Sequence, residues 1–203
     1  TTCLEPDAYH KALKIFAAAI VKPKAIVVFS AHWLSGDEVL VDSATQNKII
    51  YDFYGFPDEL YRQTYPTVGA PDLSSKINDL ISEAGFKTKT VEGRGLDHGA
   101  WEPLKIIYPD GDIPVISVSI PHQLSAQKLF ELGQSLRTLR DEKFLIMGSG
   151  DLVHNLRELD WSDKYAPVMD WAQEFESWLL KGLGEKNIKS ILDFQALGPQ
   201  ARR

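Results

Sequence analysis

Five histidines are the residues of this chain best suited to bind a metal or to move a proton near neutral pH. Four of them lie in segments whose composition predicts loops beside apolar stretches: His32, His98, His122 and His154. Loops that follow strands present side chains at one edge of a rigid sheet, so several of these imidazoles could converge on one site. Neutral imidazole is a common ligand of zinc and iron, and two histidines with one carboxylate suit ferrous iron. His10 falls in an expected helix, where we predict a surface or packing role.

Single residues in these segments leave alternatives open. His32 follows the apolar run "KAIVVFSA", where it is either a metal ligand or a polar residue at the end of a strand. Asp97 either caps a helix that begins near Gly99 or orients the neighbouring imidazole, and the cap is favoured. Ser149, in "GSG", lacks the GxSxG context of a hydrolytic nucleophile, which makes that role a minority hypothesis.

The segment "YDFYGFP", residues 51–57, is unusually dense in aromatic side chains for a connection. Such rings either line the pocket of an aromatic substrate or pack against the core beneath a long loop. Spacing along the sequence does not separate these two interpretations.

Composition excludes several classes of function. The formal net charge of −6 disfavours nucleic acids and anionic membranes as partners, because both need a basic face. The single cysteine, Cys3, excludes a cysteine-based zinc cluster and fits a reducing cytosol. The chain has no HExxH, Walker or GxGxxG motif, and no apolar run of the ~18 residues that a membrane span needs. We therefore expect a cytoplasmic protein with a small-molecule substrate.

The elements that would position the histidines alternate along the chain. Apolar residues at three- and four-residue spacing predict helices over 4–20, 71–85, 99–109, 125–141, 169–183 and 187–194. Short runs rich in β-branched residues predict strands over 24–30, 37–44, 86–92, 113–120 and 143–150. Asp72 and Ser125 are the expected caps of two helices, and Gly85 the expected end of one. The pattern predicts a single layered α/β domain over residues 1–203, with its ligand crevice at the carboxyl ends of the strands.

Four motifs in one order give the chain a family resemblance. "SAHW", "YDFYGFPDELY", "RGLDHGAWEPL" and "GSG" followed by "HNLREL" resemble the class III extradiol ring-cleavage dioxygenases, in particular their DOPA 4,5-dioxygenase-like branch. The resemblance implies a central mixed sheet flanked by helices, with a metal at the carboxyl ends of the strands. It implies that His32 is a metal ligand and that His98 lies beside substrate and oxygen. It implies that His154 is both an acid/base catalyst and a metal contact.

The same resemblance implies two further metal ligands outside this chain. Members of the family carry an "HGSP" ligand motif that would precede Thr1 and a last ligand region that would follow Arg203, so we expect short N- and C-terminal segments to be missing here. The implied activity is extradiol ring cleavage of a catechol-type substrate such as DOPA by O2. Fe(2+) is expected for activity, and Zn(2+) is plausible as the bound metal.

Two alternatives stay open: a non-catalytic metal-binding or scaffold protein on the same fold, and a zinc hydrolase. The sequence gives no basis for predicting the oligomeric state.

Overall fold

The computed structural model describes residues 4, 7–163 and 166–201, and the chain divides into two compact units, 1–150 and 151–203. Each unit is described by itself, so the expectation of a single domain stays a prediction. Cys3 lies outside the described residues.

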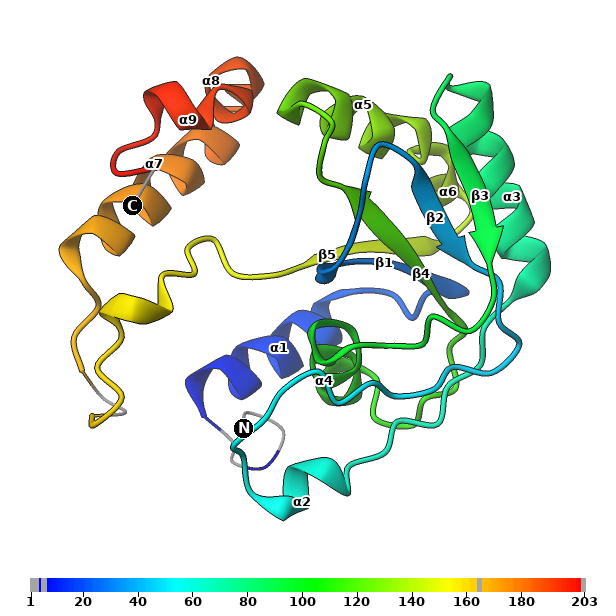
Figure 1. Cartoon of the computed structure of the whole chain (residues 1–203), viewed down its shortest axis with the longest axis horizontal. Helices are drawn as coiled ribbons and strands as arrows, with labels where there is room; N and C mark the ends of the chain where they lie inside the picture. The colour runs from blue at the N-terminus through cyan, green and yellow to red at the C-terminus, as the bar shows by residue number, and fades with distance from the viewer. Residues whose placement is uncertain (1–3, 5–6, 164–165, 202–203) are drawn as a thin grey trace. The chain divides into compact units, whose positions relative to one another are not determined.

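A five-stranded mixed sheet forms the centre of the first unit (Figure 1). Its strands are β1 (Ala25–Ser35), β2 (Val39–Asp42), β3 (Thr88–Val91), β4 (Val115–Pro121) and β5 (Phe144–Ser149). The order across the sheet is β3-β2-β4-β1-β5. β1 pairs in parallel with both β4 and β5, β2 pairs in parallel with β3, and β2 meets β4 antiparallel. The α/β prediction with a mixed central sheet is confirmed.

The helices of the first unit are α1 (Ala8–Ala19), α2 (Asp58–Tyr61), α3 (Pro71–Glu83), α4 (His98–Ile107), α5 (Ala126–Ser135) and α6 (Thr138–Asp141). They cover both faces of the sheet, with α3, α5 and α6 over one face and α1 and α4 over the other (Figure 1). Alternate residues of β1 enter two cores: Ala25 and Val27 pack under α3 and α5, and Ile26 and Val28 pack under α4. Because β1 is buried on both faces, its sequence is a continuous apolar run rather than an alternating one.

β1 is longer than the sequence indicated. The parallel ladder with β5 ends at Ser30, and the pairing with β4 shifts register between Phe29 and Leu34. The strand nevertheless continues to Ser35, so the prediction that His32 lies in a loop is wrong. The irregular stretch leaves His32 beyond the last regular pair with β5, at the carboxyl end of the parallel strands.

Helix ends follow local rules with one exception. Ser125 caps α5 by accepting a hydrogen bond from the backbone N–H of Lys128, as predicted. Gly85, at φ 84°, ends α3 as predicted, because a residue in this left-handed region breaks the helical hydrogen bonding. The prediction that Asp72 starts α3 is wrong: the helix begins at Pro71, whose missing N–H costs nothing in the first turn.

The second unit is helical. It contains the 3₁₀ helix η1 (Leu156–Glu158), α7 (Asp170–Gly184), α8 (Ile188–Leu192) and α9 (Phe194–Leu197). α7 agrees with the helix predicted over 169–183, the helix predicted over 187–194 is divided into α8 and α9, and η1 was not predicted. Within the described part of the chain, no helix has both the length and the apolar character that crossing a bilayer requires.

Candidate active site

Two predicted histidines and an aspartate that the sequence did not single out form one cluster in the first unit. His32, Asp52 and His98 each offer a ligand atom, and these atoms lie within 4.8 Å of one another. Asp52 Oδ1 is 2.9 Å from His98 Nδ1, and Asp52 Oδ2 is 3.4 Å from His32 Nδ1. The two imidazole rings lie 4.1 Å apart, centroid to centroid. Residues 32, 52 and 98 thus meet at one place although long stretches of sequence separate them.

Asp52 is ionised in this setting. Partial burial alone would raise the pKa of its carboxyl. Hydrogen bonds from the His98 backbone N–H and ring, together with the charge of His98 when protonated, outweigh burial and hold that pKa below its ordinary value. A negative carboxylate therefore stands between two imidazoles that are each about one third exposed.

Backbone pairing carries Asp52 to the start of α4. The Ile50 N–H donates to the Leu96 carbonyl at 2.8 Å, and the Leu96 N–H donates to the Lys48 carbonyl at 2.8 Å. The indole of Trp101 adds a hydrogen bond to the Ile50 carbonyl at 3.3 Å. These bonds lay the segment 48–50 beside the segment that leads into α4, and Asp52 follows two residues later.

Gly95 makes that close approach possible. It has φ 79°, and a Cβ at this position would lie 2.5 Å from the Lys48 carbonyl oxygen. A side chain is excluded both by the left-handed backbone and by the neighbouring segment. Gly95 also donates its N–H to Asp42 Oδ2 at 3.0 Å, and the same carboxylate accepts from the Gly93 N–H at 3.2 Å. The buried end of β2 therefore holds the loop that precedes α4.

A buried polar chain fixes the start of α4 against β1. Asp97 is the N-cap of α4 and accepts from the Ala100 N–H, which confirms the predicted cap. The same carboxylate accepts from the Ser30 hydroxyl at 2.6 Å and from Arg94 at 3.0 Å. The Ser30 oxygen in turn accepts from the His32 backbone N–H at 3.2 Å. Asp97 is 3% exposed, so this series of hydrogen bonds ties His32 and His98 to one buried carboxylate.

Gly99 and Ser149 complete the packing beside the two rings. A Cβ on Gly99 would lie 2.6 Å from Ser30 Oγ and 3.0 Å from His32 Cδ2, so any other residue would require these side chains to shift. The Gly99 carbonyl would normally accept from residue 103, but Pro103 has no N–H to donate. The Ser149 hydroxyl donates to this carbonyl instead. Ser149 therefore has a structural partner, and no nucleophilic role is needed to explain it.

The cluster has the chemistry of a divalent-metal site. Two imidazoles and one carboxylate are the donor set that non-haem Fe(II) enzymes use, and zinc accepts the same atoms. No described residue hydrogen-bonds the Nε2 atom of His32 or His98, so these two atoms are available to a metal, a substrate or oxygen. The residues present therefore fit a metal at His32.

His154 belongs to the second unit and lies in the irregular segment before η1. Its Nε2 is 3.9 Å from Asp151 Oδ2, and the two side chains are 57% and 74% exposed. The structure thus brings His32 and His98 together within the first unit and describes His154 separately. The metal and acid/base roles assigned to His154 are not tested and stay predictions.

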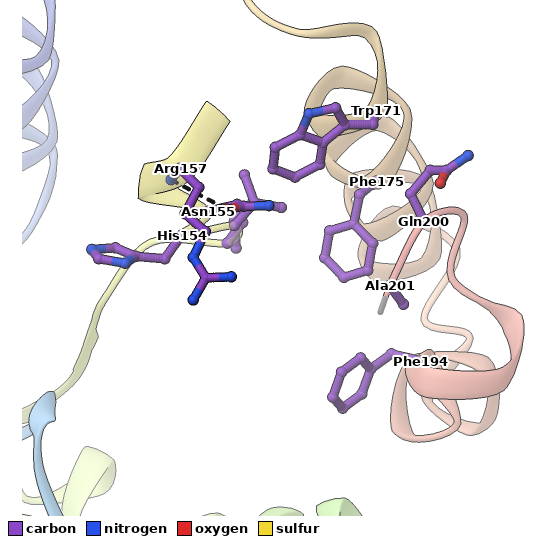
Figure 2. Close-up of a pocket in the computed structure, with 10 residues that line it drawn as sticks. His154, Asn155, Arg157, Trp171, Phe175, Phe194, Gln200 and Ala201 are labelled. Carbon is purple, nitrogen blue, oxygen red and sulfur yellow. Dashed lines mark hydrogen bonds between the residues drawn. The ribbon is translucent and has the colours of Figure 1, made fainter. Parts of the chain in front are cut away.

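His154 lines a pocket of about 460 Å³ within the second unit. Figure 2 shows Trp171 and Phe175 from α7 and Phe194 from α9 on one side, facing the segment that carries His154 and Arg157. No described residue pairs with the Arg157 guanidinium. The backbone N–H of Arg157 donates to Asn155 Oδ1. Aromatic walls with a guanidinium nearby suit a planar aromatic molecule that carries a negative charge.

The remaining histidines lie outside the cluster of three. His122 follows β4, as predicted, and its Nδ1 donates to the Ser35 carbonyl at 2.5 Å. His10 lies in α1, in agreement with the prediction of a helical position. His98 is the first residue of α4 rather than a loop residue, because Asp97 starts the helix one position earlier than expected.

Part of the aromatic segment packs against neighbouring rings, whereas Tyr54 is 92% exposed, so a pocket-lining role for the segment stays a prediction. Phe53 lies edge-on to His98 at 5.6 Å and contacts the core under α4, and Tyr51 lies 6.2 Å from Trp101. Asp52 lies between these rings in sequence and is the site residue that sequence reasoning missed. The available signal was an acidic residue in an otherwise aromatic run, because a carboxylate in such surroundings needs a partner.

Comparisons with known proteins agree with the geometry. Residues 5–203 match the family model of the catalytic LigB subunit of aromatic ring-opening dioxygenase. The chain is 42% identical over 188 residues to a protein of Beta vulgaris described as 4,5-DOPA dioxygenase extradiol, covering 92% of this chain and 68% of that protein. A protein of Escherichia coli K12 with the same description is 36% identical, over 89% of this chain and 65% of its own length.

A solved structure has the same fold. The crystal structure of an uncharacterized protein from Escherichia coli K12 superposes with a TM-score of 0.73 at 31% identity, covering 88% of this chain and 67% of that one. This chain therefore spans about two thirds of the length of these relatives.

Proposed function

Since this chain belongs to the extradiol ring-cleavage dioxygenases, in the family of the catalytic LigB subunit of aromatic ring-opening dioxygenase, we propose that it binds a divalent metal and opens the ring of a catechol-type substrate. The observation that carries the proposal is the convergence of His32, Asp52 and His98. Two imidazoles with free Nε2 atoms lie side by side at the carboxyl end of parallel strands, where α/β proteins place their ligands.

In this proposal, His32 holds the metal through Nε2, and His154 is a second protein ligand. Fe(2+) is the proposed metal for activity, and Zn(2+) the proposed competitor, because zinc binds such ligands more tightly. When bound, the metal would supply a centre at which a deprotonated catechol and O2 lie next to each other and exchange electrons. His32 is suited to its role because its backbone is fixed by the hydrogen bond to Ser30.

His98 is proposed to lie beside the substrate and oxygen. Its ring is held on one side by Asp52 and on another by the edge of Phe53, so its Nε2 has a defined direction. An imidazole in this position can accept a proton from a catechol hydroxyl or donate a hydrogen bond to oxygen.

His154 is the proposed acid/base catalyst. It is solvent-accessible, and an imidazole can both give and take a proton, so it can deliver a proton to the oxygen that leaves during ring opening and recover it afterwards. The proposed partners are therefore a small aromatic diol, with DOPA as the first candidate, and O2. The cytosol is the proposed location, because Fe(2+) is maintained there and the sequence carries one cysteine.

A panel of catechols tests this function directly. The full-length protein containing this chain is loaded anaerobically with Fe(2+), mixed with air-saturated L-DOPA or a simple catechol, and followed by absorbance and by an oxygen electrode. We expect a yellow semialdehyde product and one O2 consumed per ring opened. Product without oxygen uptake would indicate a hydrolase, and metal binding without any absorbance change across the panel would favour the scaffold alternative.

A further inference from the structure

We propose that Asp52 is a positioning residue that holds both His32 and His98 with the proton on Nδ1 and the lone pair on Nε2. This inference rests on the proposed function, since it assigns the free Nε2 atoms to a metal and to a substrate. The contacts that support it lie within the first unit and involve described residues only.

The His98 side of the arrangement is a pair of hydrogen bonds. Asp52 Oδ1 accepts from the His98 backbone N–H at 2.9 Å and stands 2.9 Å from His98 Nδ1. An ionised carboxylate can only accept, so His98 Nδ1 must carry the proton in this contact. A neutral His98 then has an unprotonated Nε2. The hydrogen bond from the His98 backbone N–H holds the Asp52 carboxylate at the first turn of α4.

The His32 side uses the other carboxylate oxygen. Asp52 Oδ2 lies 3.4 Å from His32 Nδ1, longer than a strong hydrogen bond but within ion-pair range. The two nitrogens of an imidazole point in divergent directions, so a carboxylate that faces Nδ1 of both rings leaves both Nε2 atoms directed away from it. With the rings 4.1 Å apart, one carboxylate orients two neighbouring side chains.

Asp52 is suited to orientation rather than to direct metal binding. Its Oδ1 already accepts two hydrogen bonds from His98, so a metal on that atom would have to compete with both. Metal-binding histidines generally donate their second ring N–H to a carboxylate or carbonyl, which fixes the tautomer and the direction of the ring. Asp52 gives this support to His98 through a hydrogen bond and faces His32 Nδ1 at ion-pair distance.

The tautomer of each ring is the measurement that tests the proposal without metal or turnover. Metal-free full-length protein with ¹⁵N-labelled histidine is compared with Asp52→Ala and Asp52→Asn by long-range ¹H–¹⁵N correlation spectra. We expect His98 and His32 to carry the proton on Nδ1 in the wild type and to shift towards the Nε2-protonated form in Asp52→Ala. Asp52→Asn, which keeps one acceptor oxygen, should give an intermediate result.

Two controls accompany this measurement. The His122 ring donates to the Ser35 carbonyl, so its signals should be unchanged in every Asp52 variant. Asp37→Ala removes an exposed carboxylate of the same unit that pairs with Lys87, and it should leave all histidine tautomers as they are.

Metal affinity and kinetics give the functional readout. Loss of a carboxylate that supports a metal-binding histidine typically costs 10- to 100-fold in metal affinity or activity. We expect Asp52→Ala to lower Fe(2+) affinity and kcat by about this factor while the KM for the catechol changes by less than about threefold, with Asp52→Asn between the two.

The outcomes separate this proposal from the proposed function. Unchanged tautomers in Asp52→Ala overturn the positioning role, and unchanged tautomers with complete loss of metal binding would identify Asp52 as a direct ligand instead. If the tautomers shift but the wild type opens no catechol ring, the positioning role stands and the proposed function fails.

Discussion

The histidines of the two units are held in very different ways. His32 and His98 belong to a strand and a helix, share one carboxylate, and are tied through Ser30 and Asp97 to a buried polar chain. His154 lies in an irregular segment with a largely exposed carboxylate 3.9 Å away. The first unit therefore preorganises its part of the site by its own fold, and the position of His154 depends on a segment without ladder hydrogen bonds.

The two units also differ in how many apolar side chains they bury. The first unit buries apolar side chains on both faces of its sheet. In the second unit, Phe175 is the buried hydrophobic residue among those described, and large apolar side chains such as Trp161 and Leu180 are exposed. Strands and helices packed on an extensive hydrophobic core restrain the rings of His32 and His98. Substitutions in the first unit should therefore have larger effects on activity and stability than matched substitutions in the second unit.

The largest expected effect comes from His32→Ala. Removing the imidazole that we assign to the metal should abolish both stoichiometric Fe(2+) binding and measurable ring cleavage. Metal analysis of the purified protein and the oxygen-electrode assay check this result. His122→Ala is the matched control, since it removes an exposed histidine that follows a strand of the same sheet but lies outside the cluster. Retained metal in His32→Ala would remove His32 from the ligand set.

His154→Ala tests the less constrained histidine. Loss of a general acid/base catalyst typically costs 10²- to 10⁴-fold, so kcat should fall by about that factor. Fe(2+) content, measured in the same samples, separates the two proposed roles: a catalyst alone leaves it intact, and a ligand lowers it. Normal ring cleavage by an iron-loaded His154→Ala variant would contradict both roles.

Asp97→Ala should show how strongly the first unit depends on its buried carboxylate. The variant loses a helix cap and leaves the partly buried Arg94 without its carboxylate partner, so we expect the free energy of unfolding to fall by about 3 kcal/mol. Urea denaturation followed by circular dichroism measures this change. The matched variant in the second unit is Asn187→Ala, which removes the cap of α8 and should cost about 1 kcal/mol. Equal costs would mean that the Asp97 network adds nothing to an ordinary cap.

Gly99→Ala should cost no more than Asp97→Ala. The added methyl group would press on Ser30 and His32, and overpacking of this kind costs about 1–3 kcal/mol. Gly184→Ala, at the end of α7 with open space around the new Cβ, should instead stabilise by about 0.5 kcal/mol. Thermal unfolding of the two variants checks the opposite signs. A neutral Gly99→Ala would show that the contact with His32 can relax.

Much of the fold could be predicted because its signals are local. Continuous apolar runs marked the buried strands, three- and four-residue spacing marked the helices, and the caps Ser125 and Asp97 act within three residues of their own position. The wrong cap at Asp72 and the wrong boundary of β1 have different causes. Pro71 satisfies the helix start without a side-chain cap, and the register shift in β1 depends on its neighbour β4.

The sequence by itself determined the alternation of strands and helices and the histidines that could do chemistry, because side-chain type and short-range periodicity encode both. Only the tertiary structure decided which of these histidines share a site and that Asp52 lies between them. The contact between Asp52 and His98 spans 46 residues. It depends on the pairing of the segments around Lys48 and Leu96 and on the space left by Gly95, and such long-range geometry has no signature in local spacing.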